Sequence, residues 1–418
     1  MTLYNTLAIL LTISALFSYI NHRVLKLPTT IGLMVIALLM SLVLLALNHF
    51  EVHTGFSIKG HVESVLGAIN FSDTLMHGML SYLLFAGALH VNLQDLAKYK
   101  WVISILATFG VILSTVIVGL LTWAITTWLG INVPLIYCFL FGALISPTDP
   151  ISVIGILKKI NAPKELETKI AGESLFNDGV GVVVFLLLAG IAAQSEPVTA
   201  MAVGKLFALE VLGGALFGFL IGYIAFVMLR SVNNFSVEIL ITLALVSGGY
   251  ALANVLHTSG PIAVVIAGLI IGNHGRSRAM SDETRQHLDT FWSLIDEVLN
   301  AVLFVLIGFE VLVLTLTANY LLAGALAIPA VLFARFVAVS IPVLAFKRLR
   351  TFSPKTIRIL TWGGLRGGIS VALVLSLPES DTRNLMLTMT YTVVVFSILI
   401  QGLTIGRLVR SAEQKSIT

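Results

Sequence analysis

The sequence is short of charged residues and of cysteine. Asp, Glu, Lys and Arg make up 11% of its 418 residues, whereas soluble domains average about 25%, so these side chains cannot cover a surface that faces water. The one cysteine, Cys138, excludes a disulfide-based scaffold. A hydrophobic fraction of 57% excludes intrinsic disorder. The composition therefore predicts an all-α polytopic membrane protein.

Long apolar segments follow one another along the chain. A helix needs about 20 apolar residues to cross a bilayer, and about thirteen segments qualify. They lie near residues 3–20, 29–47, 74–91, 101–129, 134–157, 170–193, 203–229, 236–257, 260–273, 291–315, 320–346, 355–377 and 384–406. The first lacks the basic residues and the cleavage motif of a signal peptide, so we expect it to remain as a span. We expect a single membrane domain over residues 1–410 and a short tail at 411–418.

The positive charges alternate between loops. Of the 25 Lys and Arg residues, 20 fall in one set of alternate loops and in the tail, whereas the other set has only Lys59, Lys205 and Arg383. Cytoplasmic loops carry the excess of Lys and Arg. The sequence therefore predicts a multi-pass protein of the cell (inner) membrane, with the N-terminus outside and the C-terminus in the cytoplasm. This distribution explains the net charge of +4, so the expected partner is the lipid bilayer and not a nucleic acid.

Five charged residues lie well inside the apolar spans and form the candidate cluster: Asp149, Glu173, Asp178, Arg335 and Arg366. A charge at the bilayer centre costs about 2.5–3.5 kcal/mol, and ionisable residues in spans commonly mark ion or proton pathways. From the helical rise, Asp149 and Asp178 lie about 12 Å from the same side of the membrane. We therefore expect the two carboxylates to face each other. A network of buried salt bridges that only locks helices together is the alternative interpretation.

Two of the spans contain sequence breaks. The fifth includes Pro147 and Pro150, and the twelfth includes Gly-Gly-Leu-Arg-Gly-Gly at 363–368. Proline removes an amide donor and blocks a helical turn. Discontinuous helices at corresponding positions of two inverted repeats are typical of ion sites in secondary transporters. The spans fit two repeats of six helices with opposite orientation, over about 3–193 and 236–406.

The sixth span brings polar side chains to the same level. Ser174 and Asp178 are one helical turn apart, with Asn177 beside them. Glu173 is rotated by about 100° from Ser174 and can meet another helix, where Arg335 is the expected partner of this otherwise costly buried charge. Oxygen atoms of Asp, Ser and unwound backbone suit a small alkali cation such as Na+. The spans contain no His/Cys cluster of the kind that binds transition metals.

These motifs resemble those of the NhaP-type sodium/proton antiporters, which are monovalent cation:proton antiporters. The resemblance rests on Thr-Asp-Pro at 148–150, Gly-Glu-Ser-Leu-Phe-Asn-Asp-Gly at 172–179, Ala-Arg at 334–335 and the glycine-rich segment at 363–368. It extends over essentially the whole membrane chain. The resemblance implies a thirteen-helix inverted-repeat fold, a homodimer, and an elevator-like motion of a core against a dimerisation domain.

The family pattern also implies how the cation is held. Asp178 and Asp149 would bind either the transported Na+ or a proton, helped by Ser174 and the backbone of Thr148, with Asn177 in the same site. Members with Asn before the second of these aspartates are usually electroneutral, which implies exchange of one cation for one proton. No cofactor is implied.

Three further residues have supporting roles in the family pattern. Glu173 and Arg335 would form an ion pair, and Arg366 would compensate the charges where the broken helices cross. Many relatives carry an acidic residue in the third span, where this chain has Leu-Phe-Ala-Gly at 84–87. The predicted function is secondary active exchange of Na+, or Li+, for H+ by alternating access.

Other functions remain open at the level of sequence. A K+/H+ antiporter would have the same mechanism, because side-chain types alone do not set the preference among alkali cations. An intramembrane aspartyl enzyme could use Asp149 and Asp178 as an acid/base pair, but neither lies in a Gly-x-Gly-Asp turn. An ion channel would need a pore loop or a carbonyl filter motif, and the sequence has neither. We therefore predict a transporter and not an enzyme.

Overall fold

The computed structural model describes residues 3–51, 71–160, 162–193, 200–276, 280–312, 314–346 and 355–417. Every regular element in these ranges is a helix. The elements are α1 (Leu3–Ile20), η1 (Asn21–Leu25), α2 (Thr29–Glu51), α4 (Phe71–Asp73), η2 (Thr74–Met79), α5 (Leu80–His90), α6 (Leu93–Ile105), η3 (Leu106–Gly110), α7 (Val111–Trp128), α8 (Leu135–Ile145), α9 (Ile151–Lys159), α10 (Lys164–Ala193), α11 (Ala200–Ser231), α12 (Phe235–Val255), α13 (Gly260–Ile270), η4 (Ile271–Gly275), α15 (Asp282–Phe309), η5 (Glu310–Leu312), α16 (Ala318–Phe346), α17 (Thr356–Trp362), α18 (Gly368–Leu375), α19 (Asp381–Phe396), η6 (Ser397–Gln401) and α20 (Gly402–Ile417).

The all-helical prediction is confirmed, and each predicted apolar segment contains helix. Among the described residues, 8 helices are long and apolar enough to cross a membrane, and Leu135–Ile145 and Gly260–Gly275 are shorter apolar helices. The bounds differ from the sequence prediction in places. α10 begins at Lys164 rather than near residue 170, because its polar first turns continue the helix beyond the apolar stretch. The last helix continues through most of the predicted tail, as far as Ile417.

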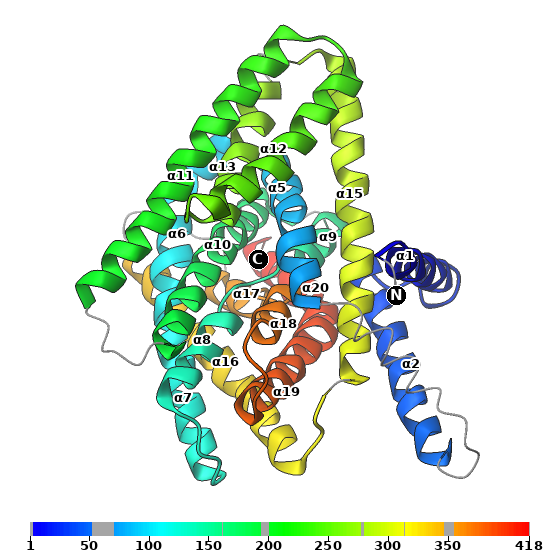
Figure 1. The fold of residues 1–418 in the computed structure, drawn as a ribbon, viewed down its shortest axis with the longest axis vertical. Helices are drawn as coiled ribbons and strands as arrows, with labels where there is room; N and C mark the ends of the chain where they lie inside the picture. Colours follow the sequence, from blue (N-terminus) through cyan, green and yellow to red (C-terminus); the bar gives the residue numbers. More distant parts are fainter. Residues whose placement is uncertain are drawn as a thin grey trace.

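The helices pack mainly within two sets. The first set contains α1, α2, α5, α11, α12, α13 and α15, and the second contains α6 to α10 and α16 to α20. In Figure 1, α15 runs beside α1 and α2 along one edge of the molecule, and α11 forms the opposite edge. The largest cluster of buried apolar residues joins helices of both sets, including α2, α8, α15, α16 and α19. A cavity lined by Asp149 and Asp178 lies between the two sets.

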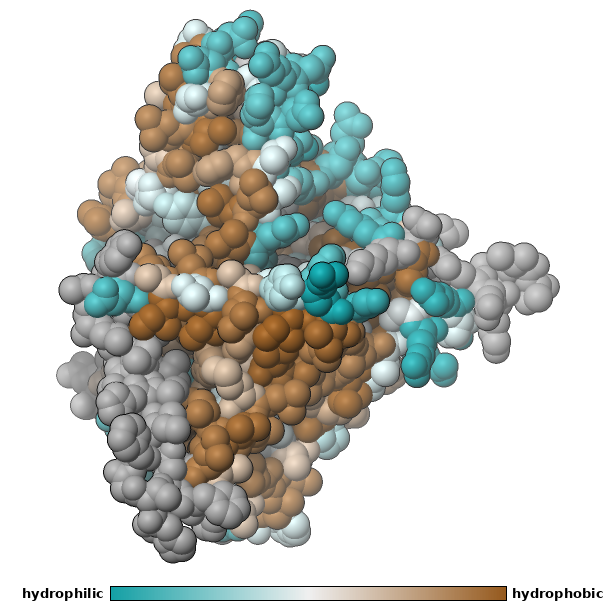
Figure 2. Space-filling model, turned by 90° about the vertical axis from the view of Figure 1, so that its right-hand side faces the viewer, coloured by the Kyte–Doolittle hydropathy of each residue, from teal (hydrophilic) through white to brown (hydrophobic). Residues whose placement is uncertain are grey.

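Much of the outer surface is apolar. On α11, five leucines are between 49% and 72% exposed: Leu206, Leu209, Leu212, Leu216 and Leu220. Figure 2 shows a broad hydrophobic surface over the lower part of one face, with hydrophilic residues gathered toward the top and the right-hand margin. Exposed apolar surface on this scale is typical of a protein that lies in lipid.

Both predicted helix breaks are present. α8 ends at Ile145 and α9 begins at Ile151, and the residues between them, which include both prolines, are not helical. α17 ends at Trp362 and α18 begins at Gly368, with Arg366 in the extended segment between them. An unwound segment inside a membrane leaves amide and carbonyl groups without helical partners, and these groups need other ones. The structure supplies those partners at the site described next.

Candidate functional site

The two unwound segments cross and bond to each other. The backbone N–H of Asp149 donates to the carbonyl oxygen of Leu365 at 2.8 Å. The backbone N–H of Arg366 donates to the hydroxyl of Ser397 on η6 at 2.9 Å. These bonds satisfy groups that a continuous helix would have paired internally, so the break in one span depends on the break in the other.

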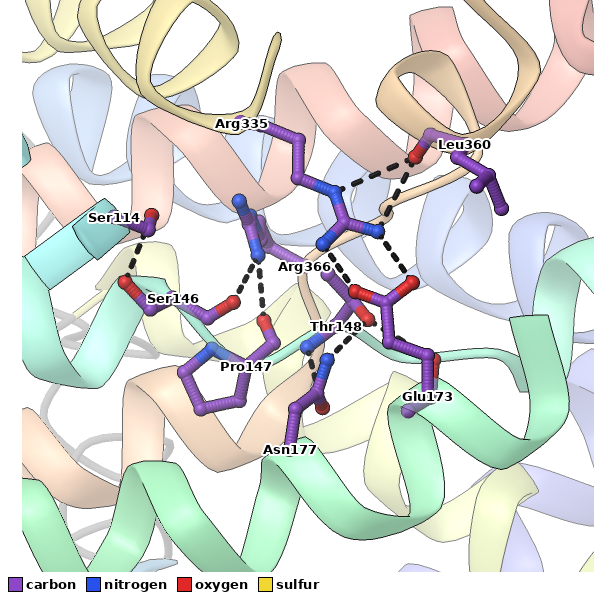
Figure 3. A network of polar contacts seen from close by, with 10 residues as sticks. Ser114, Ser146, Pro147, Thr148, Glu173, Asn177, Arg335, Leu360 and Arg366 are labelled. Carbon is purple, nitrogen blue, oxygen red and sulfur yellow. Dashed lines mark hydrogen bonds and ion pairs between the residues drawn. The ribbon is translucent and has the colours of Figure 1, made fainter. Parts of the chain in front are cut away.

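The guanidinium of Arg366 closes the carbonyl end of α8. Its Nη1 donates to the carbonyl oxygen of Ser146 at 2.5 Å and to that of Pro147 at 2.8 Å, as Figure 3 shows. The last carbonyls of a helix have no helical donors and carry partial negative charge. Arg366 is 2% exposed. The sequence interpretation of Arg366 as the charge partner of the broken helices therefore has a direct geometric counterpart.

Two buried side chains of α10 hold the next residue of the unwound segment, Thr148. The amide of Asn177 donates from Nδ2 to the Thr148 hydroxyl at 2.9 Å and accepts from the Thr148 backbone N–H at 3.3 Å (Figure 3). The hydroxyls of Thr148 and Ser174 lie 2.9 Å apart. All three residues are buried. Ser174 and Asn177, which lie about one turn apart on the same face of α10, thus fix the backbone immediately before Asp149.

The predicted ion pair between Glu173 and Arg335 is formed. The guanidinium of Arg335 faces the Glu173 carboxylate with both terminal nitrogens, and one of these contacts measures 2.9 Å. Nε and Nη2 of Arg335 also donate to the carbonyl oxygen of Leu360, at 3.3 and 3.2 Å (Figure 3). Both charged side chains are buried. The pair connects α10 with α16 and α17 behind the crossing.

A cavity of about 720 Å³ reaches the crossing from one side of the molecule. Asp149 and Asp178 both line it, and their charges interact. The cavity extends to the exposed residues Lys158 and Lys164, in the loop set that carries most of the basic residues. Its walls come from both helix sets: α5 and α15 on one side, and α9, α10 and the start of α18 on the other. The two carboxylates therefore lie where a solvated cation can reach them.

Gly367 lies next to the carboxylates, where there is no room for a side chain. A Cβ atom on Gly367 would lie 2.6 Å from Oδ2 of Asp149. The backbone of Gly367 has φ −123°, which other residues adopt readily. The absence of a side chain at 367 therefore serves the position of the Asp149 carboxylate and not the backbone conformation.

The structure brings together all eight residues singled out from the sequence, in three groups. Asp149 and Asp178 line the cavity, whereas Thr148, Ser174 and Asn177 are bonded to one another behind its wall. The remaining three, Glu173, Arg335 and Arg366, bond the unwound segments and their helices from the side away from the cavity.

Sequence analysis missed the contribution of α15 to this cavity. Asp296 and Glu297 line it, opposite the crossing. Both fall within the predicted tenth span, 291–315. The available signal was Asp296 and Asn300, one turn apart on the face of an amphipathic helix.

The chemistry of the site favours a hard monovalent cation or a proton. Carboxylate, hydroxyl and carbonyl oxygens are the atoms near the crossing that could bind a cation. Within the described parts of the chain, no group of three or more His, Cys, Asp or Glu side chains is arranged to hold a metal ion.

Comparison with known proteins then identifies the family. The model of the family described as "Sodium/hydrogen exchanger, transmembrane" matches residues 11–411. The chain belongs to this family.

Individual relatives agree. The chain is 51% identical over 408 residues to the Na(+)/H(+) antiporter NhaP of Pseudomonas aeruginosa, covering 96% of this chain and 95% of that protein. It is 33% identical over 393 residues to the Na(+)/H(+) antiporter NhaH of Halobacillus aidingensis, with 93% of each chain covered. As a member of the sodium/hydrogen exchanger family, the protein is a transporter and not an enzyme.

The fold of the family is also found in a solved structure. The sodium proton antiporter MjNhaP1 of Methanocaldococcus jannaschii superposes with a TM-score of 0.74 over 98% of both chains, at 19% sequence identity. This likeness establishes the fold.

The segment of the third span at 84–87 contributes Leu84, Ala86 and Gly87 to the cavity wall. This segment therefore brings no acidic side chain to the cavity.

Proposed function

We propose that this exchanger transports Na+, with Li+ as a further substrate, in exchange for H+ with one-for-one stoichiometry, at a site centred on Asp178 and Asp149. The observation that carries the proposal is the convergence of these two carboxylates at the inner end of a cavity open to one side. Ionisable groups that face a water-filled cavity inside a membrane protein are typical of ion pathways. A relative 51% identical is a Na(+)/H(+) antiporter.

The same carboxylate carries either substrate. Asp178 holds a cation when it is deprotonated and returns without one when it is protonated, so the charge that crosses is the same in both directions. Asn177 cannot titrate, and its amide is engaged by Thr148. A second proton is therefore not expected, and exchange should be electroneutral.

The groups behind the cavity wall position the binding atoms. Ser174 and the backbone of Thr148 supply further oxygen ligands to the cation, and Asn177 holds Thr148 in place. The Glu173–Arg335 pair and Arg366 keep the crossing intact by bonding to backbone carbonyls on both broken helices. In this proposal the supporting charges do not touch the cation.

The membrane arrangement follows from the same features. We place about thirteen helices across the cell membrane as two inverted repeats, 3–193 and 236–406, with the N-terminus outside and residues 411–418 in the cytoplasm. The cavity beside Lys158 and Lys164 then opens to the cytoplasm. The helix set with α10 moves against the set with α11 and α15, and the exposed apolar residues of α11 support a homodimer or lipid contact there.

The test uses purified protein in proteoliposomes with a trapped pH dye. Na+, Li+ and K+ are added in turn, with and without a clamped membrane potential. Proton efflux on Na+ addition that is insensitive to potential is the expected result. Asp178→Asn should abolish the flux, and Glu283→Gln, at an exposed carboxylate, should leave it unchanged. A response to K+ alone would show that K+, and not Na+, is the transported cation. Full activity of Asp178→Asn would overturn the assignment of the site.

A further inference from the structure

A second group of oxygen atoms lies across the cavity from the two aspartates. Asp296 of α15 lines the cavity, and Asn300 follows one helical turn later on the same face. The side chains of Asn300 and Asp296 lie within hydrogen-bonding reach of each other, and the charge of Asp296 interacts with His90, Asp149 and Glu297. The cavity thus has carboxylates on both helix sets, Asp296 on one and the pair Asp149 and Asp178 on the other.

Asn300 has a property that a purely structural residue would avoid. It is 4% exposed, and its carbonyl oxygen Oδ1 has no hydrogen-bond donor among the described residues. Buried amide oxygens normally have a donor, because an unpaired one loses its hydration without compensation. The Asn300 side chain lies beside the Asp296 carboxylate. A cation beside Asp296 would give this oxygen its missing partner.

The neighbouring polar groups are engaged in other ways. Nδ1 of His90 lies 2.7 Å from the carbonyl oxygen of Ala86, and Nε2 lies 3.4 Å from the hydroxyl of Ser293. Glu297 is exposed. Asp296 is therefore a carboxylate in this wall that has a buried, unpaired carbonyl oxygen beside it, that of Asn300.

We propose that Asp296 and Asn300 form a staging site for the transported monovalent cation, where it exchanges part of its hydration shell for protein oxygens before it reaches Asp149 and Asp178. The inference rests on the proposed exchange function and extends it to the opposite helix set. Because α15 and α10 belong to different sets, a cation held at Asp296 is released from one set and taken up by the other.

Transport kinetics distinguish a specific cation site at Asp296 from a non-specific attraction of cations by the negative charges of the cavity. Asp296→Asn and Asn300→Leu should each raise the KM for Na+ about five- to tenfold with little change in maximal rate, as expected for loss of one cation contact. Glu297→Gln removes a charge from the same wall and serves as the matched control, with a smaller rise. Choline chloride screens exposed charges, so it should abolish the Glu297→Gln effect and leave that of Asp296→Asn. Equal effects of the two variants, both lost in salt, would overturn the staging site.

A second Asn300 variant distinguishes loss of a cation contact from misfolding. Asn300→Asp keeps the oxygen and adds a charge, so it should lower the KM for Na+ relative to the unmodified protein. An unchanged or higher KM in a folded Asn300→Asp protein would also overturn the proposal.

Binding measurements separate this inference from the proposed function. Broadening of the ²³Na NMR signal reports weak Na+ binding to purified protein without transport. Asp178→Asn should lose exchange but keep a weak Na+ site, and Asp178→Asn combined with Asp296→Asn should lose that site as well. If unmodified protein showed no exchange, the proposed function would fail, and the Asp296-dependent broadening would still decide the staging site. Broadening unaffected by Asp296→Asn would contradict it.

Discussion

The backbone amide of Asp149 lies 2.8 Å from the carbonyl oxygen of Leu365, to which it donates a hydrogen bond. This contact joins two helix breaks that are far apart in the sequence, and it fixes the backbone of a residue whose side chain lines the cavity. The position of the carboxylate is thus set by backbone geometry on both broken spans. Substitutions near the crossing should affect cation binding even where they do not touch the cation.

Gly367→Ala tests the space beside Asp149. The added methyl would lie 2.6 Å from Oδ2 of Asp149, so the carboxylate must move. We expect the KM for Na+ to rise about tenfold or more, corresponding to about 1.4 kcal/mol of binding, with the unfolding temperature little changed. Gly155→Ala is the matched control, because Gly155 lines the same cavity and its Cβ would meet nothing within 4 Å. Sodium titrations of proton flux in proteoliposomes measure both, and equal KM values would contradict the prediction.

Removing one partner of the buried ion pair should destabilise the protein. Glu173→Gln leaves the Arg335 charge uncompensated, and such a loss typically costs about 3–5 kcal/mol. Thermal unfolding in detergent should show a clear decrease. Combining it with Arg335→Met should recover part of the stability, because no unpaired charge remains. As a control, Glu283→Gln at the exposed pair with His287 should leave the transition unchanged.

Arg366 should tolerate lysine better than methionine. Arg366→Met leaves the carbonyl oxygens of Ser146 and Pro147 without a donor, at about 1–3 kcal/mol for each buried group. We expect this variant to lose exchange and stability together. Arg366→Lys keeps a positive charge and should retain partial exchange. Flux and unfolding temperature measured on the same preparations test this order, and a fully active Arg366→Met protein would rule out the compensating role.

The Thr148 hydroxyl should matter for positioning. Thr148→Val keeps the shape but removes the contacts to Ser174 and Asn177, which leaves polar atoms of both unpaired, at about 1–3 kcal/mol. The KM for Na+ should rise as well. Thr115→Val is the control: the Thr115 hydroxyl is also buried but has no hydrogen-bond partner among the described residues, so its removal should not destabilise. Similar losses of stability in both variants would contradict the positioning role.

Much of the site could be predicted because local chemistry fixed it. Pro147 and Pro150 cannot continue a helix, so the break in the fifth span followed from residue type alone. The helical period placed Glu173 on a different face from Ser174 and predicted a partner on another helix, and the structure has Arg335 there. Asp296 and Asn300 were missed because a polar pair at the start of a span looks the same whether it faces water or a cavity.

The sequence by itself determined that this is an all-helical membrane protein that resembles the sodium/hydrogen exchangers, with two broken spans and charged residues near the middle of its spans. It could do so because hydropathy, proline and charge act locally. The tertiary structure decided which atoms meet. Only packing placed the Arg366 guanidinium on the carbonyls of Ser146 and Pro147, and only packing brought α15 opposite the aspartates. The physical reason is that the cost of burying a charge or an unpaired carbonyl demands a partner but does not specify which one.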